Sequence, residues 1–480
     1  MTIEQSIYLF SQTQPEKVAI VSGTTCVTYG ELWQNILLAR EYFANLPNYR
    51  RASRVVIAAN KQVEFLYAYF GAHMANLVAV PVDSEINPNR LEYICHKVTQ
   101  VHIIGLEKMM NNAASVSLKI FSNLNSNVAS EDIVFPADQD IADMLFTTGT
   151  TGEPKCVPLT FCNEWAAATN INSYIGNTTA DKELLALPIS HSFGLGRIRC
   201  CLQKGQTLYL LGSFANVKRF FRIMEEEQIT GFAMVPASWK FLQSMSGDKL
   251  SAFACQLRYV EMGSAFLSPE DKYQLSQLLP QTRIAMHYGL TEASRSAFLE
   301  FHDTDHLESV GKAAPNTDIK IFDPEGRQLP FGQDGEIGIK GVHVMQCYWG
   351  AKKDECFYGD YFRTGDYGSM DKEGYLTLKS RMKELINVGG KKVSPIEVEE
   401  QLLCIDGIKD CACVAMADPN GILGEVVKAC VVLSDKSLKL ENINSQLSGK
   451  LESYKIPAKY EIVSEIPRTH NGKIQRIALR

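Results

Sequence analysis

The first hundred residues alternate short apolar runs with segments of helical period, and this alternation constrains the fold more than any other feature. The runs "KVAIVSG", "RVVIAAN", "LVAVPVD" and "VHIIGL" are rich in β-branched residues, and helical segments such as "YGELWQNILLAREYFANL" and "VEFLYAYFGAHMA" stand between them. Repeated βα units imply parallel strands with helices over both faces. We therefore expect an α/β fold whose large N-terminal domain is built of helix-covered, mostly parallel sheets.

The pattern changes beyond about Lys379. "EVEEQLLCI" and "ENINSQLSGKLESY" are typical of helices, while "DCACVAMAD", "EVVKACVVL" and "KYEIVSEI" are typical of strands. Together they predict a small α+β C-terminal domain. The expected division is residues 1–380 and 384–480, with a boundary near 381–383.

Composition limits the partners and the compartment. The 480 residues carry a net charge of -6 and no dense Lys/Arg block, so nucleic acid is disfavoured. The 13 cysteines are scattered, which indicates reduced thiols instead of a disulfide framework or a zinc site. No apolar run is long enough to span a membrane, and "MTIEQSIYLF" lacks a signal-peptide pattern, so we expect a cytoplasmic protein.

A threonine- and glycine-rich loop, "MLFTTGTTGEPKCVPLT", follows an apolar run. Such loops direct backbone N–H groups and hydroxyls toward one point, and Lys155 adds positive charge, so the loop suits phosphate oxygens. Gly149 and Gly152 are too close for a Walker A motif. Taken alone, an ordinary turn between strands explains the loop equally well.

Read with the later segments, the loop resembles the phosphate-binding motif of the adenylate-forming (ANL) superfamily, which includes acyl- and aryl-CoA synthetases. That motif reads [ST]-[ST]-G-[ST]-T-G-x-P-K-G, and Cys156 replaces its last glycine. The resemblance runs from "VTYGELW" to "NGKIQR". It implies that the phosphate contacts are Thr147, Thr148, Gly149, Thr150, Thr151, Gly152 and Lys155.

Three further segments resemble motifs of the same superfamily, in the same order. "LPISHSFGLG" implies that His191 acts in the acid pocket, and "MHYGLTEAS" implies that Thr291 contacts the α-phosphate while Glu292 holds magnesium. "YFRTGDYG" implies that Asp366 binds the ribose hydroxyls. The walls of the nucleotide and acid pockets would come from Gly263, Ser264, Ala265, His287, Tyr288 and Gly289, joined on the acid side by Ser192, Phe193 and Trp239. For Phe193 and Trp239 a plain core role is an equal alternative.

The C-terminal motifs imply a two-step reaction. "KSRMKELINVGGKKVSPIEVEE" resembles the hinge motif, with Arg381 as a nucleotide contact and Lys383 as the pivot. "IPRTHNGKIQR" supplies Lys473 for adenylation, and rotation would then replace Lys473 with the Gly389–Gly390 face, where the pantetheine arm of CoA approaches.

The chemistry agrees with these assignments. A carboxylate is a weak nucleophile and ATP is strongly anionic, so attack on the α-phosphorus requires charge neutralisation and in-line positioning. Amino-acid-activating relatives carry an aspartate at the position of Ser192, so α-amino acids are disfavoured and neutral acyl or aryl acids are preferred.

The sequence therefore predicts an acid–thiol ligase that uses ATP and Mg²⁺, forms an acyl-adenylate with release of pyrophosphate, and transfers the acyl group to CoA. Three alternatives stay open: a ligase for an acyl carrier protein, a stand-alone amino-acid adenylation enzyme, and a catalytically silent nucleotide-binding relative.

Overall fold

The computed structural model describes residues 1–47, 49–60, 62–99, 101–106, 115–124, 133–147, 154–435, 438, 440–468 and 474–479. The chain forms two compact units, the first of Met1–Asp318 with Ile339–Phe362 and the second of Ile319–Gly338 with Arg363–Arg480. The chain passes from one unit to the other within three strands, β16 (Thr317–Phe322), β17 (Gly335–Gly341) and β19 (Tyr361–Met370). The predicted boundary at residues 381–383 falls inside the second unit and stays a prediction.

The first unit contains a six-stranded sheet in the order β6-β5-β3-β4-β7-β8. All its strand pairs are parallel except β7–β8. The predicted α/β class with mostly parallel sheets is thereby confirmed. The bounds of the strands are β3 Arg54–Ala59, β4 Val78–Asp83, β5 Val101–Ile104, β6 Ser115–Val116, β7 Ile141–Thr147 and β8 Lys155–Thr160.

A nine-stranded sheet in the same unit has the order β15-β14-β13-β12-β11-β9-β10-β1-β2. Its central run from β13 to β1 is parallel, and the strands at the two margins are antiparallel. Its strands are β1 Val18–Ser22, β2 Thr25–Thr28, β9 Lys182–Leu185, β10 Thr207–Leu210, β11 Gly231–Met234, β12 Tyr259–Met262, β13 Arg283–Tyr288, β14 Ala297–Glu300 and β15 Lys312–Ala313. The short strand β18 (Phe357–Tyr358) does not belong to this sheet and pairs with β19.

Nine α-helices of the first unit fall within its described residues. Capping boxes start α1, α2 and α5. The side chains of Thr2, Thr28 and Thr160 each accept a hydrogen bond from the backbone N–H of the third helical residue, and the backbone N–H of each threonine donates to the side chain of that residue. The bounds are α1 Ile3–Thr13, α2 Tyr29–Ala44, α3 Val63–Met74, α4 Pro88–Val98, α5 Phe161–Ile175, α6 Ser192–Lys204, α7 Val217–Glu226, α8 Pro236–Ser246 and α9 Pro269–Leu278.

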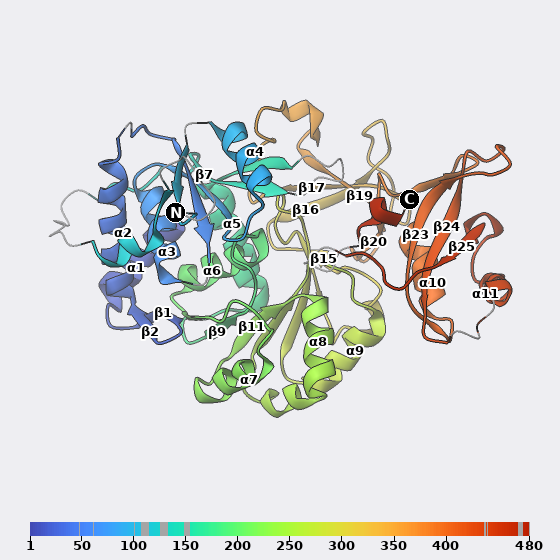
Figure 1. Cartoon of the computed structure of the whole chain (residues 1–480), viewed down its shortest axis with the longest axis horizontal. Helices are drawn as coiled ribbons and strands as arrows, with labels where there is room; N and C mark the ends of the chain where they lie inside the picture. The colour runs from blue at the N-terminus through green and yellow to red at the C-terminus, as the bar shows by residue number, and fades with distance from the viewer. Residues whose placement is uncertain are drawn as a thin grey trace. The chain divides into compact units, whose positions relative to one another are not determined.

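Helix α6 lies between the two sheets of this unit, as the labels α6, β7 and β9 in Figure 1 show. Its Arg199 pairs with Asp143 on β7, and its Arg197 pairs with Glu183 on β9. Both arginines are buried. The helix that begins at the predicted acid pocket is therefore held by ion pairs to both sheets.

The second unit has its own apolar core under the sheet β23-β24-β25. Helix α11 ends at Leu447, short of the predicted Tyr454, because the chain turns at Gly449, whose φ is 92°. The remaining bounds are β20 Leu376–Arg381, β21 Ile386–Val388, β22 Lys391–Val393, α10 Pro395–Leu403, β23 Ile408–Ala417, β24 Glu425–Leu433, α11 Leu440–Leu447 and β25 Lys459–Ile462.

Candidate active site

Two predicted phosphate contacts flank the loop between β7 and β8. Thr147 is the last residue of β7, Lys155 is the first of β8, and the two are opposite each other in the antiparallel pair. The strand pair therefore holds both ends of the loop in register. The other predicted loop residues lie outside the described residues: Thr148, Gly149, Thr150, Thr151 and Gly152.

Lys155 contacts Tyr348, which binds the predicted magnesium ligand. The Nζ atom of Lys155 lies 4.3 Å from the centre of the Tyr348 ring, a cation–π contact. The Tyr348 hydroxyl donates a hydrogen bond of 2.7 Å to Oε1 of the buried Glu292. Sequence reasoning missed Tyr348, and the signal available for it was the aromatic pair of Tyr348 and Trp349 in a loop.

Glu292 fits the role of a magnesium ligand by its chemistry. Carboxylate oxygen is the ligand type that Mg²⁺ prefers, and because this ion keeps several of its waters, it needs only one or two protein carboxylates. The hydrogen bond from Tyr348 orients the carboxylate, as partners of metal ligands commonly do.

The predicted acid-pocket segment lies at the start of α6. His191 precedes the helix, and Ser192 and Phe193 are its first residues. The Oγ atom of Ser192 lies 3.3 Å from Oγ1 of Thr291, so the predicted acid-binding segment and the predicted α-phosphate contact are hydrogen-bonded. The positive end of the helix dipole favours an anion at this point.

The predicted nucleotide-pocket residues gather at one edge of the nine-stranded sheet. Strands β12 and β13 are parallel neighbours, with Met262 opposite Met286, so their carboxyl ends meet at the same edge. A Cβ on Gly263 would lie 2.3 Å from Nε2 of His287, so this close packing of the strand end on the imidazole requires glycine. This edge carries Gly263, Ser264 and Ala265 after β12, and His287, Tyr288 and Gly289 at the end of β13.

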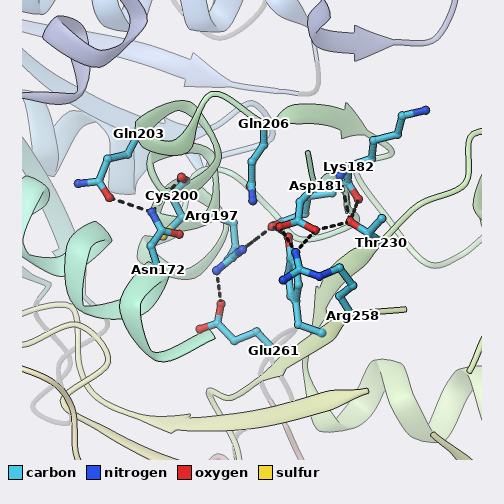
Figure 2. Close-up of polar contacts among 12 residues, drawn as sticks. Asn172, Asp181, Lys182, Arg197, Cys200, Gln203, Gln206, Thr230, Arg258 and Glu261 are labelled. Carbon is cyan, nitrogen blue, oxygen red and sulfur yellow. Dashed lines mark hydrogen bonds and ion pairs between the residues drawn. The ribbon is translucent and has the colours of Figure 1, made fainter. Parts of the chain in front are cut away.

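Two arginines and two carboxylates form a buried network beside this edge. Arg197 binds Glu261 at 3.0 Å and Glu183 at 2.8 Å, and Arg295 binds Glu261 at 3.1 Å (Figure 2 shows the Arg197–Glu261 pair). Burial opposes ionisation of Glu261, but Arg295 and Arg197 hold its pKa well below the usual range. Burial lowers the pKa of His287 in spite of its neighbour Glu261, so this histidine is neutral at pH 7. The four charges of the network balance.

A cavity of about 20 Å³ adjoins the Ser192–Thr291 contact. This volume is enough for one water molecule. Of the described residues predicted for the acid pocket, Ser192 lines the cavity, whereas His191, Phe193, Trp239 and Gly289 do not. The rest of its wall is Leu159, Asn163, Glu164, Ala167, Ala168, Ile171, Gly196, Arg199, Thr291, Ser294, Arg295 and His343.

Trp239 and Phe193 have different surroundings. Trp239 on α8 is 1 % exposed and belongs to the apolar core that also contains Met234 and Met262. The ring of Phe193 meets His287 edge to face at 4.6 Å between ring centres. Phe193 therefore contacts the predicted nucleotide edge, while the role of Trp239 in the acid pocket stays a prediction.

In the second unit, two predicted nucleotide contacts bind each other. Asp366 on β19 lies opposite Arg381 on β20, and Oδ1 of Asp366 is 2.8 Å from Nε of Arg381. Asp366 is 2 % exposed, and its backbone N–H donates to Oγ1 of Thr364. The structure thus places a buried, ion-paired carboxylate where the sequence predicts the ribose ligand.

The predicted hinge and CoA residues lie in turns of the second unit. Lys383 is exposed in the turn after β20. Gly389 and Gly390 form the two-residue turn between β21 and β22 with φ of 57° and 84°, which is the conformation that a tight hairpin requires of both central residues. Lys473 lies outside the described residues.

Comparison with known proteins identifies the class. The model of the AMP-binding enzyme family matches residues 9–349, and that of the AMP-binding enzyme C-terminal domain matches residues 397–473. The chain belongs to the AMP-binding enzyme family, within the ANL superfamily, and to its acyl- and aryl-CoA ligases, which work through an acyl-adenylate.

Relatives and solved structures match over almost the whole chain. The chain is 26% identical to 2-succinylbenzoate--CoA ligase from Staphylococcus aureus (strain MSSA476), over 98% of both proteins, and 27% identical to feruloyl-CoA synthase from Amycolatopsis sp, over 98% of this chain and 96% of that one. The structure of ATP-bound MatB from Rhodopseudomonas palustris matches with a TM-score of 0.89 and 25% identity, over 100% of this chain and 98% of that one.

A structure of o-succinylbenzoate CoA synthetase (MenE) from Bacillus subtilis, with ATP and a magnesium ion, shares the fold. Its TM-score is 0.86 at 23% identity, over 99% of this chain and 98% of that one. Similar proteins thus hold ATP and magnesium. Within the described part of this chain, no helix is both long enough and apolar enough to cross a membrane.

Proposed function

We propose that this chain activates a neutral carboxylic acid at the sheet edge formed by the start of α6 and the ends of β12 and β13. The observation that supports this most is the contact between Ser192 and Thr291, because it joins the predicted acid-binding segment to the predicted α-phosphate contact. Attack of the acid on the α-phosphorus requires these two groups to be adjacent.

Each side chain then has a role in the first step. Thr291 contacts the α-phosphate, Lys155 contacts the outer phosphates, and Glu292 holds magnesium, which would neutralise charge on the triphosphate. Asp366 accepts hydrogen bonds from the ribose hydroxyls, and Lys473 contributes a cation during adenylation. The supporting geometry for Glu292 is its hydrogen bond from Tyr348, which fixes the carboxylate.

The charge balance near the pocket supports a neutral acid. Arg197 and Arg295 are compensated by Glu183 and Glu261, so the network leaves no unpaired charge for a charged substrate tail. An α-ammonium group would lack a carboxylate at Ser192, and an unpaired charge in a closed pocket costs several kcal/mol.

CoA is the proposed acceptor, with a carrier-protein thiol as the alternative. The two relatives are named as a CoA ligase and a CoA synthase, which supports CoA. The acids in the two names differ from each other, so the names do not indicate which acid this chain activates. The cytoplasmic location also stays a prediction from the sequence.

A substrate panel tests this function. Pyrophosphate release is measured with Mg²⁺ and ATP for paired acids, each α-amino acid beside its deaminated analogue, and thioester formation is then measured with CoA and with a phosphopantetheinylated carrier protein. The deaminated acids should be turned over faster. Glu292→Gln should abolish release, while Glu308→Gln, at an exposed glutamate, should not change it. Higher specificity for an amino acid than for its analogue would contradict the proposal.

A further inference from the structure

Arg295 holds the first residues of α6 by their backbone. Its Nη1 donates a hydrogen bond of 3.2 Å to the carbonyl oxygen of Ser192, and its Nη2 donates one of 2.9 Å to the carbonyl oxygen of Phe193. The guanidinium carbon also lies 4.8 Å from the centre of the Phe193 ring. One planar group therefore fixes both the backbone and the aromatic ring of the predicted acid-pocket segment.

The same guanidinium contacts the other two segments of the sheet edge. Its Nε donates to Oε1 of Glu261 at 3.1 Å, just before the end of β12, and its Nη1 donates to Oγ of Ser294 at 3.0 Å. Ser294 and Arg295 follow Thr291 and Glu292 in the chain, with only Ala293 between the two pairs. Arg295 thus links the acid segment, the end of β12 and the segment of the predicted α-phosphate contact.

The surrounding backbone is adapted to this arginine. A Cβ on Gly196 would lie 2.4 Å from Nη1 of Arg295, and a Cβ on Gly289 would lie 2.4 Å from its backbone nitrogen. Arg295 itself has a φ of 54°, in the left-handed region that non-glycine residues rarely adopt. Residues held in this conformation are strained and persist where the surrounding structure determines them.

The contacts of the guanidinium indicate what it does. It donates hydrogen bonds to two protein carbonyls, a hydroxyl and a carboxylate whose charge it balances, and the side chain is 2 % exposed. We infer that Arg295 is a positioning residue, which sets the affinity for the acid by fixing Ser192 and Phe193 against Thr291. This inference rests on the proposed function, and it adds a residue that belongs to no motif of the sequence analysis.

The test is Arg295→Lys, because lysine keeps the charge beside Glu261 but cannot donate to two carbonyls and a carboxylate in one plane. Arg197→Lys is the matched control, since Arg197 is equally buried and binds the same Glu261, and its other side-chain hydrogen bonds go to Glu183 instead of residues 192 and 193. The KM for the acid, the KM for ATP, kcat and the melting temperature are measured for each variant.

We expect Arg295→Lys to raise the KM for the acid at least tenfold and to leave the KM for ATP within about threefold of wild type. Arg197→Lys should lower the melting temperature as much or more and leave the KM for the acid within twofold. A merely structural role predicts lower stability with both KM values unchanged, because the molecules that stay folded keep the native site. An unchanged KM for the acid in Arg295→Lys would overturn the inference.

A second variant covers the case in which Arg295→Lys does not fold. Gly196→Ala keeps the arginine and favours the helix, but its Cβ displaces Nη1, so the KM for the acid should rise here as well. A folded Gly196→Ala variant with the wild-type KM would also overturn the inference. If wild-type protein releases no pyrophosphate with any acid, the proposed function fails and this role fails with it; active wild type with an unaffected Arg295→Lys contradicts the role alone.

Discussion

Replacing Tyr348 by phenylalanine isolates the hydrogen bond that orients the predicted magnesium ligand. Phenylalanine keeps the ring, and with it the contact to Lys155 at 4.3 Å, and removes only the hydroxyl that donates to Glu292 over 2.7 Å. A hydrogen bond to a charged group contributes about 1.5–3 kcal/mol, which corresponds to roughly 10- to 150-fold. Loss of a partner that orients a metal ligand costs about 10- to 100-fold in metal affinity or activity.

We therefore expect Tyr348→Phe to raise the Mg²⁺ concentration for half-maximal pyrophosphate release about 10- to 100-fold, at saturating ATP and acid. The assay is a Mg²⁺ titration of the initial rate. Tyr361→Phe is the matched control, because the Tyr361 hydroxyl also donates to a carboxylate, that of Asp318, at an exposed position, and Tyr361 is not one of the predicted site residues.

Loss of carboxylate orientation predicts a specific dependence of the rate on Mg²⁺ concentration. High Mg²⁺ should restore much of the rate of Tyr348→Phe, since the carboxylate is still present and only its orientation is lost. A wild-type Mg²⁺ titration for Tyr348→Phe would refute the assignment of Glu292 as an oriented metal ligand. An equal shift in Tyr361→Phe would show that the effect is not specific to this hydrogen bond.

Three further predictions concern half-reactions and pH. Lys473→Ala should slow pyrophosphate release about 10²- to 10³-fold and largely spare thioester formation from supplied acyl-adenylate; equal loss in both steps would contradict rotation. Lys383→Pro should spare adenylation and suppress thioester yield, because proline fixes φ and obstructs one domain arrangement; wild-type yield would place the hinge elsewhere. The buried His73 ring bonds Glu4 at 2.7 Å and Asp143 at 3.2 Å, and although burial alone would lower its pKa, these bonds raise it to about 10. The stabilisation of the fold by protonated His73 is therefore complete below about pH 6.5 and is lost as pH rises through about 10. In urea unfolding, the difference in unfolding free energy between wild type and His73→Gln should shrink in that window by up to about 1.4 kcal/mol per pH unit. A difference that stays constant with pH would contradict the charged imidazole.

The elements that sequence reasoning placed well are those with a strong local pattern. The run "RVVIAAN" became β3 (Arg54–Ala59) and "VEFLYAYFGAHMA" became α3 (Val63–Met74), because β-branched clusters and helical period are properties of neighbouring residues. The motif at residues 286–294 is also a continuous segment, so it can be found in this one sequence. Local signals of this kind were enough to predict the fold class and to find most of the residues at the edge formed by the ends of β12 and β13.

The residues that were missed are those whose importance is not local. Arg197, Arg199 and His73 are charged or titratable residues, and such residues in a helix usually face solvent, yet all three are buried against carboxylates from other elements. Tyr348 comes to Glu292 across 56 positions of sequence. The pairing of Asp366 with Arg381 follows from the register of β19 and β20, which the spacing of two motifs does not reveal.

The placement of α6 shows what its two buried arginines do. Arg197 and Arg199 stand two positions apart, so on a helix they point in nearly opposite directions. One binds Glu183 and Glu261 in the nine-stranded sheet, and the other binds Asp143 in the six-stranded sheet. Apolar side chains of the same volume could match the stability of such pairs, because desolvation consumes most of their gain. They would allow α6 to rotate or slide, however, whereas the two arginines hold the body of the helix between the sheets, and Arg295 holds its first residues, where Ser192 meets Thr291.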